Sequence, residues 1–300
     1  MEKRVSYHVQ EEEEGISLGE LLSKRGLTKR QISAAKFRER GICLEGKSAR
    51  VTCLVHAGQR VEVRLETDAQ ASRHLIPVEG PLTVLYEDED LIAVDKPAGM
   101  AVHPSGVHYQ DTVANVLAGY FAGKQESVRI RAVGRLDRET SGILIFAKNQ
   151  IAAARLAEQK KNGSFYKEYL ALVQGRFPDK EGMITSPIGR GEGIRMRVES
   201  EGKQALTKYL VWKEGDRGGE ALCALQVRIE TGRTHQIRVH MASIGHPLLG
   251  DTLYGGMCDG ISRTALHARK AVFFQPFTGE KLCLEAKIPE DMVSCFPVIM

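Results

Sequence analysis

Residues 134–148 read Gly134-Arg-Leu-Asp-Arg-Glu-Thr-Ser-Gly-Ile-Leu-Ile-Phe-Ala-Lys148. A dense polar segment is followed directly by an apolar run that predicts a buried strand. Asp, Thr, Ser and Gly can hold a tight loop through hydrogen bonds to the backbone. A loop braced on a rigid strand is a good place to hold one carboxylate, here that of Asp137. Local chemistry alone favours an ordinary turn, so a functional Asp137 needs support from other parts of the chain.

From residue 82 onward, strand-like and helix-like segments interleave, and several strand-like segments are adjacent in sequence. This order is typical of an α+β domain built on a mixed, largely antiparallel sheet flanked by helices, here residues 81–300. The strand-like segments are TVLYED, LIAVDKP, GILIFAK, KEYLALVQG, ALTKYLVW and ALCALQVRIE, and the helix-like segments are DTVANVLAGYFAG, NQIAAARLAEQKK and THQIRVHMASIG.

Residues 15–67 predict a second, smaller domain that contains a helix pair and a hairpin. Ser17 is an expected N-cap for a helix over residues 18–25, and Thr28 for a helix over residues 29–40. A glycine follows each of these segments, as at many helix C-termini.

Residues 42–44 predict a short strand, and the alternating residues 61–65 predict a half-buried one. The acidic run 11–14 is expected to be a solvated, poorly ordered lead-in. Residues 68–80 are polar and weakly patterned, which favours a linker between the two domains.

The small domain is basic: residues 15–64 hold eleven Lys or Arg against four Asp or Glu, a local charge of +7, compared with +4 for the whole chain. Lys29, Arg30, Lys36 and Arg38 lie on the second predicted helix. A helix pair with this charge could bind a phosphate backbone, or it could be an ordinary solvated surface. Charge alone leaves both interpretations open.

The composition, with 42% hydrophobic and 27% charged residues, is that of a globular protein with a sizeable core. The N-terminus has no apolar segment like that of a signal peptide, and no apolar run approaches the roughly 20 residues needed to span a bilayer. None of the six cysteines forms a CxxC pair. We therefore expect a cytoplasmic protein with reduced cysteines and no membrane partner.

Three patterns suggest nucleotide or metal sites without the required context. Gly41 to Ser48 fits the phosphate-loop pattern GxxxxGK[ST], but a helix is predicted before the motif and a strand within it, where the loop needs a strand first and a helix afterwards. Residues 189–193 are glycine-rich but lack that frame too, and favour a flexible loop. His235 and His240 are five apart rather than the four that place two ligands on one helix face. We expect no metal and no nucleotide cofactor.

Two further segments concentrate polar groups beside apolar strands. Residues 165–173 place Tyr169 at the start of a strand, where it could be core packing, or could stack on a base and assist a proton transfer. Residues 231–240 lead from a strand into a helix, and Arg238 there could be a surface residue or could pair with a buried carboxylate.

Together these segments resemble the RluA family of pseudouridine synthases, over about residues 82–290. GRLDRETSG is similar to the HRLDxxTSG signature of that family, and several other motifs follow in family order. The N-terminal segment, residues 16–47, resembles the small RNA-binding domain of ribosomal protein S-four. The other matching motifs are LIAVDKPAGMAVHP, KEYLALVQG, GKQALTKY, TGRTHQIRVHMASIGHPLLGDTLYG, ALHA and PFTGE.

The resemblance implies roles for single residues. Asp137 corresponds to the essential aspartate, and Arg238 to the arginine that pairs with it. Tyr169 corresponds to a tyrosine that stacks on the target base and could act as general base. Arg135 corresponds to an arginine that enters the RNA and helps to expel that base. One position departs from the pattern: Gly134 replaces the usual histidine.

The expected activity is therefore isomerisation of specific uridines in structured ribosomal or transfer RNA, by a monomer that uses Asp137 and no cofactor. Two rivals come from other classes. A non-catalytic RNA chaperone would need only the basic small domain, and a glycosidase would use Asp137 and Glu139 as paired carboxylates.

Overall fold

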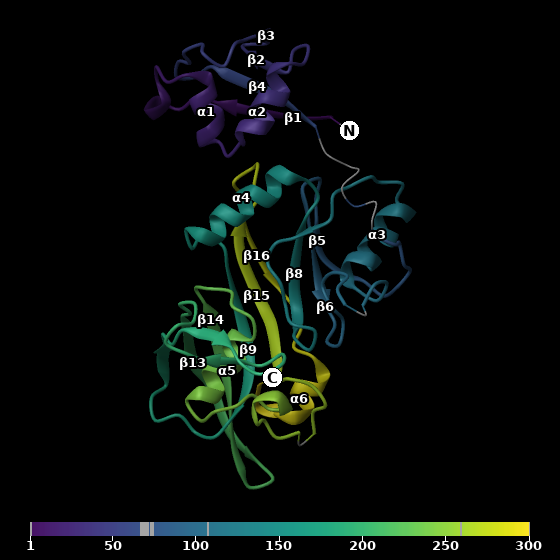
Figure 1. The fold of residues 1–300 in the computed structure, drawn as a ribbon, viewed down its shortest axis with the longest axis vertical. Coiled ribbons are helices and arrows are strands. Elements are labelled where there is room, and N and C mark those ends of the chain that lie inside the picture. The colour runs from purple at the N-terminus through teal and green to yellow at the C-terminus, as the bar shows by residue number, and fades with distance from the viewer. Residues whose placement is uncertain (1, 67–71, 73–74, 107, 259, 300) are drawn as a thin grey trace.

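The chain is described here from a computed structural model over residues 2–66, 72, 75–106, 108–258 and 260–299, and these residues form three sheets. A four-stranded sheet lies at one end of the long axis (Figure 1). A ten-stranded sheet, a two-stranded hairpin and the remaining helices make up the rest. We call residues 2–66 the small unit and residues 75–299 the large unit.

The small unit is an antiparallel sheet covered by two short helices. Its strands lie in the order β1 (Glu2–His8), β4 (Arg60–Glu66), β2 (Ile42–Leu44), β3 (Lys47–Ser48). Helix α1 (Leu18–Lys24) begins at Ser17, whose side chain accepts a hydrogen bond from Glu20 N. Helix α2 (Lys29–Lys36) begins at Thr28, which forms a capping box with Gln31. The predicted N-caps and strands are thus present, but α2 ends at Lys36, with Phe37 as its C-cap, rather than just before Gly41 as predicted.

The first fourteen residues differ from the prediction. Strand β1 pairs along its whole length with β4, so the small sheet begins well before residue 15. The acidic run is not a disordered lead-in, because Glu11–Glu13 form a 3-10 turn, η1. Glu13 is buried and accepts a hydrogen bond of 2.7 Å from Arg25 Nη2. The run is ordered because the charged hydrogen bond between Glu13 and Arg25 joins it to the end of α1.

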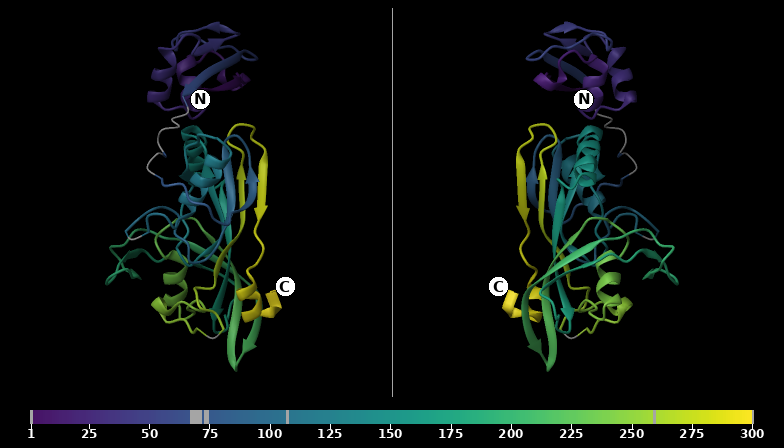
Figure 2. Two further views of the ribbon diagram at one scale, coloured as in Figure 1. Left: turned by 90° about the vertical axis from the view of Figure 1, so that its right-hand side faces the viewer. Right: turned by 90° about the vertical axis from the view of Figure 1, so that its left-hand side faces the viewer.

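The small unit packs against one helix of the large unit, α4 (Gln150–Lys161), as both views in Figure 2 show. Ile151 of α4 belongs to the apolar core of the small unit. Arg155 donates hydrogen bonds to Tyr7 Oη, Arg25 O and Pro276 O at 2.5, 2.6 and 2.7 Å. These contacts tie the small unit to α4.

The predicted linker, residues 68–80, lies partly outside the described residues, which exclude 67–71 and 73–74. Its remaining C-terminal part belongs to the large unit. Leu75 is buried in the main core, and Asn115 Nδ2 donates to Ile76 O at 2.9 Å.

The large sheet is mixed and largely antiparallel, as predicted. Among its described pairings, only that of β15 with β8 is parallel. Two further strands extend the sheet: β16 pairs with β15, and β7 pairs with β8. In spatial order the main strands are β10 (Glu181–Ile184), β13 (Thr207–Arg217), β14 (Glu220–Ile229), β9 (Tyr166–Gln174), β15 (Leu266–Phe274), β8 (Ser141–Ala147), β6 (Leu91–Lys96) and β5 (Thr83–Glu87), with β16 (Lys281–Glu285) and β7 (Arg131–Ala132) beside them.

Helices cover both faces of this sheet. Alternate residues of β6, β8, β9 and β14 form the main core with α3 (Val113–Gly123) and α5 (Gln236–Ser243). The intervening residues pack on the other face, against α4 near β8 and against α6 (Glu290–Cys295) near β9 and β14. Strand β8 is buried throughout, so the polar loop before it is attached to a strand in the interior of the sheet.

Two motifs take the local structure that their context demands. Gly41 to Ser48 contains the β2–β3 hairpin, whose turn residues Glu45 and Gly46 have positive φ, and no helix follows it. Residues 189–193 are only partly loop: Gly189 and Arg190 belong to β11 (Ile188–Arg190), and residues 191–193 lie in the turn that joins it to β12 (Met196–Val198) in a two-stranded hairpin. Short strands of this kind lack the apolar alternation that predicts longer ones.

All six cysteines are free. Within the described ranges, no helix combines the length and apolarity needed to cross a bilayer. The same residues hold no group of three or more His, Cys, Asp or Glu side chains arranged to bind a metal.

Candidate active site

Asp137 lies in the loop between β7 and β8, and glycines and buried hydroxyls hold that loop in place. Thr140 N donates to the Asp137 carbonyl at 3.1 Å, and the Ser141 hydroxyl bonds to His267 Nδ1 at 2.9 Å. Gly142 has φ +105°, and a Cβ there would collide with the backbone of Ala268 on β15. Only glycine fits this close approach at such a φ, which explains the glycine that ends the polar segment.

A buried lysine also holds this loop in place through hydrogen bonds to backbone carbonyls. Lys96, at the end of β6, is fully buried, and its Nζ donates to Pro97 O at 2.8 Å, Met100 O at 2.8 Å and Arg138 O at 3.0 Å. One ammonium thus joins the segment after β6 to the residue next to Asp137. Burial lowers the pKa of Lys96 to about 8.

This pKa predicts a pH dependence of stability. Between pH 8 and the usual lysine value of 10.5, only the unfolded chain keeps the proton on Lys96, so the free energy of unfolding rises with pH. The gain is at most about 3 kcal/mol. Urea unfolding at pH 7.5 and pH 10 measures the free energy of unfolding of the wild type and of Lys96→Met. Between these pH values, the free energy of unfolding should rise more in the wild type than in Lys96→Met, and the difference is the contribution of Lys96. Equal changes in the two proteins would contradict the prediction.

Arg238, on α5, lies beside Asp137 but makes its strongest contact elsewhere. Its Nη1 is 3.9 Å from Asp137 Oδ2. Its Nε and Nη2 form a fork with Asp251, at 2.7 and 2.8 Å, and Asp251 is buried. The predicted pairing with Asp137 is therefore the looser of two contacts. Sequence reasoning missed Asp251, although it lies within the longest matching motif.

Tyr169, on β9, is buried and lines the same site. Burial, and to a smaller extent the charge of Asp137, raises the pKa of Tyr169 far above its usual value. Its phenol therefore keeps its proton at neutral pH. A proton-accepting phenolate, the base expected from the sequence, is disfavoured at this position.

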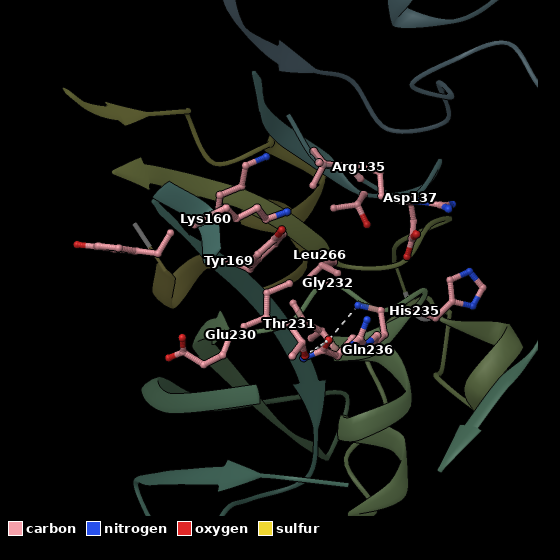
Figure 3. A pocket seen from close by; sticks show the side chains of 18 of the residues that line it. Arg135, Asp137, Lys160, Tyr169, Glu230, Thr231, Gly232, His235, Gln236 and Leu266 are labelled. Carbon is pink, nitrogen blue, oxygen red and sulfur yellow. Dashed lines mark hydrogen bonds between the residues drawn. The ribbon is translucent and has the colours of Figure 1, made fainter. Parts of the chain in front are cut away.

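An open cavity of about 180 Å³ joins these residues (Figure 3). Asp137, Arg135 and Gly134 line it from the loop before β8, Tyr169 from β9, and Arg238 from α5. Arg135 is exposed at its edge. The structure thus brings together four predicted residues that are up to about 100 positions apart in sequence, around one space open to solvent.

His235 lines the cavity and is a second residue to which sequence reasoning assigned no role. It is the N-cap of α5 and adopts φ 55°, ψ 21°, a left-handed conformation that is uncommon outside glycine. Tyr254 Oη accepts from Met196 N at 2.9 Å, which leaves its own proton for His235 Nδ1, also at 2.9 Å. Burial lowers the pKa of His235. Strain of this kind often marks a functional site.

The four basic residues predicted for RNA binding lie apart from the cavity, in the small unit. Lys29, Arg30 and Lys36 are exposed on α2, and Arg38 follows this helix and is partly buried. Phe37, 80% exposed, lies beside Lys36, whose ammonium is 5.1 Å from the ring centre.

Comparisons with known proteins agree with this architecture. The sequence pattern of the RNA pseudouridylate synthase family matches residues 90–243. The RNA pseudouridine synthase YhcT of Bacillus subtilis is 40% identical over 241 residues, which cover 80% of this chain and 78% of that protein. Ribosomal large subunit pseudouridine synthase D of Xanthomonas campestris is 36% identical over 265 residues, covering 83% and 78%.

A solved structure of human RNA pseudouridylate synthase domain containing 1 has a TM-score of 0.58 and 28% identity, and covers 72% of this chain and 87% of that chain. The family pattern spans the loop of Asp137, Tyr169 and Arg238, which surround the cavity. The chain belongs to the RluA family of RNA pseudouridine synthases, isomerases that convert uridine to pseudouridine in RNA.

Proposed function

We propose that this isomerase modifies specific uridines of large-subunit ribosomal RNA, and that Asp137 is its catalytic carboxylate. The observation that carries the proposal is the position of Asp137. Its carboxylate lies 3.9 Å from Arg238 Nη1 and lines an open cavity that Tyr169 also lines. Several similar proteins carry the name ribosomal large subunit pseudouridine synthase D, which supports this RNA as the substrate.

The reaction fits one carboxylate in a positively charged surrounding. The bond from ribose C1′ to N1 of uracil breaks, the base turns, and C1′ joins C5. C5 then loses its proton and N1 gains one, so the product is an isomer of uridine. Asp137 can stabilise positive charge on the sugar, add to it, or remove a proton from it. Arg238 is held by Asp251 and so presents its remaining nitrogen to Asp137 without having to reorganise.

Tyr169 is proposed to stack on the uracil rather than to remove its proton. A buried phenol with a raised pKa is a poor base, and its ring forms an apolar wall of the cavity. The uridine must leave its stack to reach Asp137, at a cost of a few kcal/mol. Stacking on Tyr169 offsets part of this cost, and Arg135, exposed at the cavity edge, is placed to enter the gap in the RNA.

The small unit is proposed to bind the RNA backbone through α2. If it does, a triple variant in which Lys29, Arg30 and Lys36 are each replaced by Gln will bind RNA more weakly and with a smaller salt dependence. Each lost phosphate contact should reduce the slope of log K against log salt by about 0.7–0.9. Filter binding to a large-subunit RNA transcript at several salt concentrations measures this slope. The control is Lys180→Gln, an exposed lysine of the large unit; a triple variant with the wild-type slope would show that α2 does not bind RNA.

The remaining expectations also belong to the proposal: a monomer that acts in the cytoplasm, without a metal or cofactor. Mapping of pseudouridines in total RNA from a strain that lacks this protein tests the substrate directly. We expect specific sites of large-subunit ribosomal RNA to lose pseudouridine and to regain it when the wild-type chain is supplied. Loss confined to transfer RNA would overturn the assigned substrate, and release of free sugar or base would favour a hydrolase.

A further inference from the structure

The ammonium of Lys160 lies between two loops of the active-site cavity, at two positions where the chain has no side chain. A Cβ on Gly134 would be 2.8 Å from Lys160 Nζ, and one on Gly232 would be 3.8 Å from it. Gly134 belongs to the loop of Asp137, and Gly232 to the segment that leads into α5. Any side chain at 134 would therefore compete with Lys160 for this space.

The helix that carries Lys160 is fixed at its other end. Lys160 is in the last turn of α4, whose first two turns are anchored by Ile151 and Leu156 in two apolar cores and by the hydrogen bonds of Arg155. The backbone of Lys160 is thus held in place, and its side chain extends from this support into the cavity lining (Figure 3).

Lys160 has no ion-pair or hydrogen-bond partner among the described residues, whereas the other charges near it are largely satisfied. Glu230, the acid that lines the cavity on that side, bonds to Lys208 at 2.9 Å. Arg238 is engaged by Asp251, and Lys167 Nζ donates to Ile143 O at 2.7 Å. The ammonium of Lys160 is therefore free to contact an anion that enters the cavity.

The surroundings are cationic enough to affect neighbouring groups. Lys160 as a whole is exposed, but its ammonium lies beside the loops of Gly134 and Gly232, and partial burial there lowers the pKa of Lys160. Burial, and then the charge of Lys160, lowers the pKa of Lys167 to about 7. Arg135 lines the same cavity, so three basic side chains, Arg135, Lys160 and Lys167, lie around it.

We propose that Lys160 is an RNA-binding residue of this active site, whose ammonium contacts a phosphate next to the target uridine across the space left free by Gly134. The inference rests on the proposed function, because it assigns a contact for that substrate. A uridine turned into the cavity carries its flanking phosphates to the cavity edge. An ammonium has three donors and no acceptor, and binds phosphate as a compact point charge.

The first test compares Lys160→Met with the wild type on a large-subunit ribosomal RNA transcript. Met keeps a long flexible stem and removes the charge. We expect KM to rise about 5- to 10-fold, with kcat changed less than about twofold, because a phosphate contact holds substrate and transition state alike. The salt slope of binding should fall by about 0.7–0.9. Lys160→Arg keeps the charge and should restore KM to within about twofold.

The neighbouring Lys161 provides a matched control. It is 78% exposed, its only described partner is Glu158 at 3.8 Å, and it does not line the cavity. Lys161→Met should therefore have the KM and salt slope of the wild type. Thermal melts of both variants check that the fold is retained.

The second test locates the phosphate. In a synthetic hairpin that carries the mapped uridine, a neutral methylphosphonate replaces in turn the phosphate on each side of it. At one of the two positions, this change should raise the KM of the wild type about as much as Lys160→Met does. The same change should leave the KM of Lys160→Met unaltered, because the contact is already lost.

The outcomes separate the two proposals. If the wild type forms no pseudouridine in ribosomal RNA, the proposed function fails. If the wild type is active and Lys160→Met matches it in KM and salt slope, only the Lys160 assignment fails. A fall in kcat with KM and salt slope unchanged would also overturn the assignment, since it would show a contact to the reacting groups rather than to phosphate.

Discussion

Asp137→Asn is expected to lower kcat on the order of 10⁴-fold or more and to leave RNA binding within about threefold of the wild type. Asn keeps the shape of the side chain and its fit in the loop before β8, but it removes the negative charge with which Asp137 would stabilise the sugar, add to it or take a proton from it. Tritium release from RNA labelled at C5 of uridine measures turnover, and filter binding measures affinity.

Glu139→Gln is the matched control for this variant. Glu139 is two residues away, and its described partner is its neighbour Arg138, at 3.1 Å from Nε to Oε1. It does not line the cavity. We expect Glu139→Gln to keep nearly full activity. If Asp137→Asn turned over at the wild-type rate, Asp137 would not be catalytic; if both variants were inactive, a pair of acting carboxylates would have to be considered.

Arg238→Met is expected to affect both stability and activity. It leaves Asp251, 1% exposed, without its fork of two charged hydrogen bonds. Breaking a buried ion pair on one side typically costs about 3–5 kcal/mol, since a buried charge remains uncompensated. The free energy of unfolding, measured with urea, should fall by about this amount, and turnover should fall because Asp137 loses the cation beside it.

A double variant separates these two effects. In Arg238→Met with Asp251→Asn the buried charge is gone, so much of the lost stability should return. Turnover should stay low, because no cation is restored next to Asp137. Full stability of Arg238→Met alone would contradict the assigned role of the Asp251 fork. Wild-type turnover of the double variant would show that Asp137 needs no arginine.

Much of the local structure follows from residues close together in the chain. Ser17 and Thr28 cap their helices through side-chain contacts three residues away, and such contacts are visible in sequence order. Near-continuous apolar runs predicted β8, β9 and β14, because each of these strands buries side chains on both of its faces. Strand β1 and the 3-10 turn η1 were missed because their order depends on β4 and Arg25, far along the chain.

The active site divides in the same way. By itself, the sequence determined the fold class, the order of the main elements and the identity of Asp137, Tyr169 and Arg238 as candidates, because local pattern and family motifs follow the order of the chain. Only the tertiary structure decided that Asp251 holds Arg238, that burial keeps Tyr169 protonated, and that Lys160 lies over Gly134. The reason is physical: charge pairing and desolvation depend on which groups meet in space, and the folded sheet brings together residues that are distant in sequence.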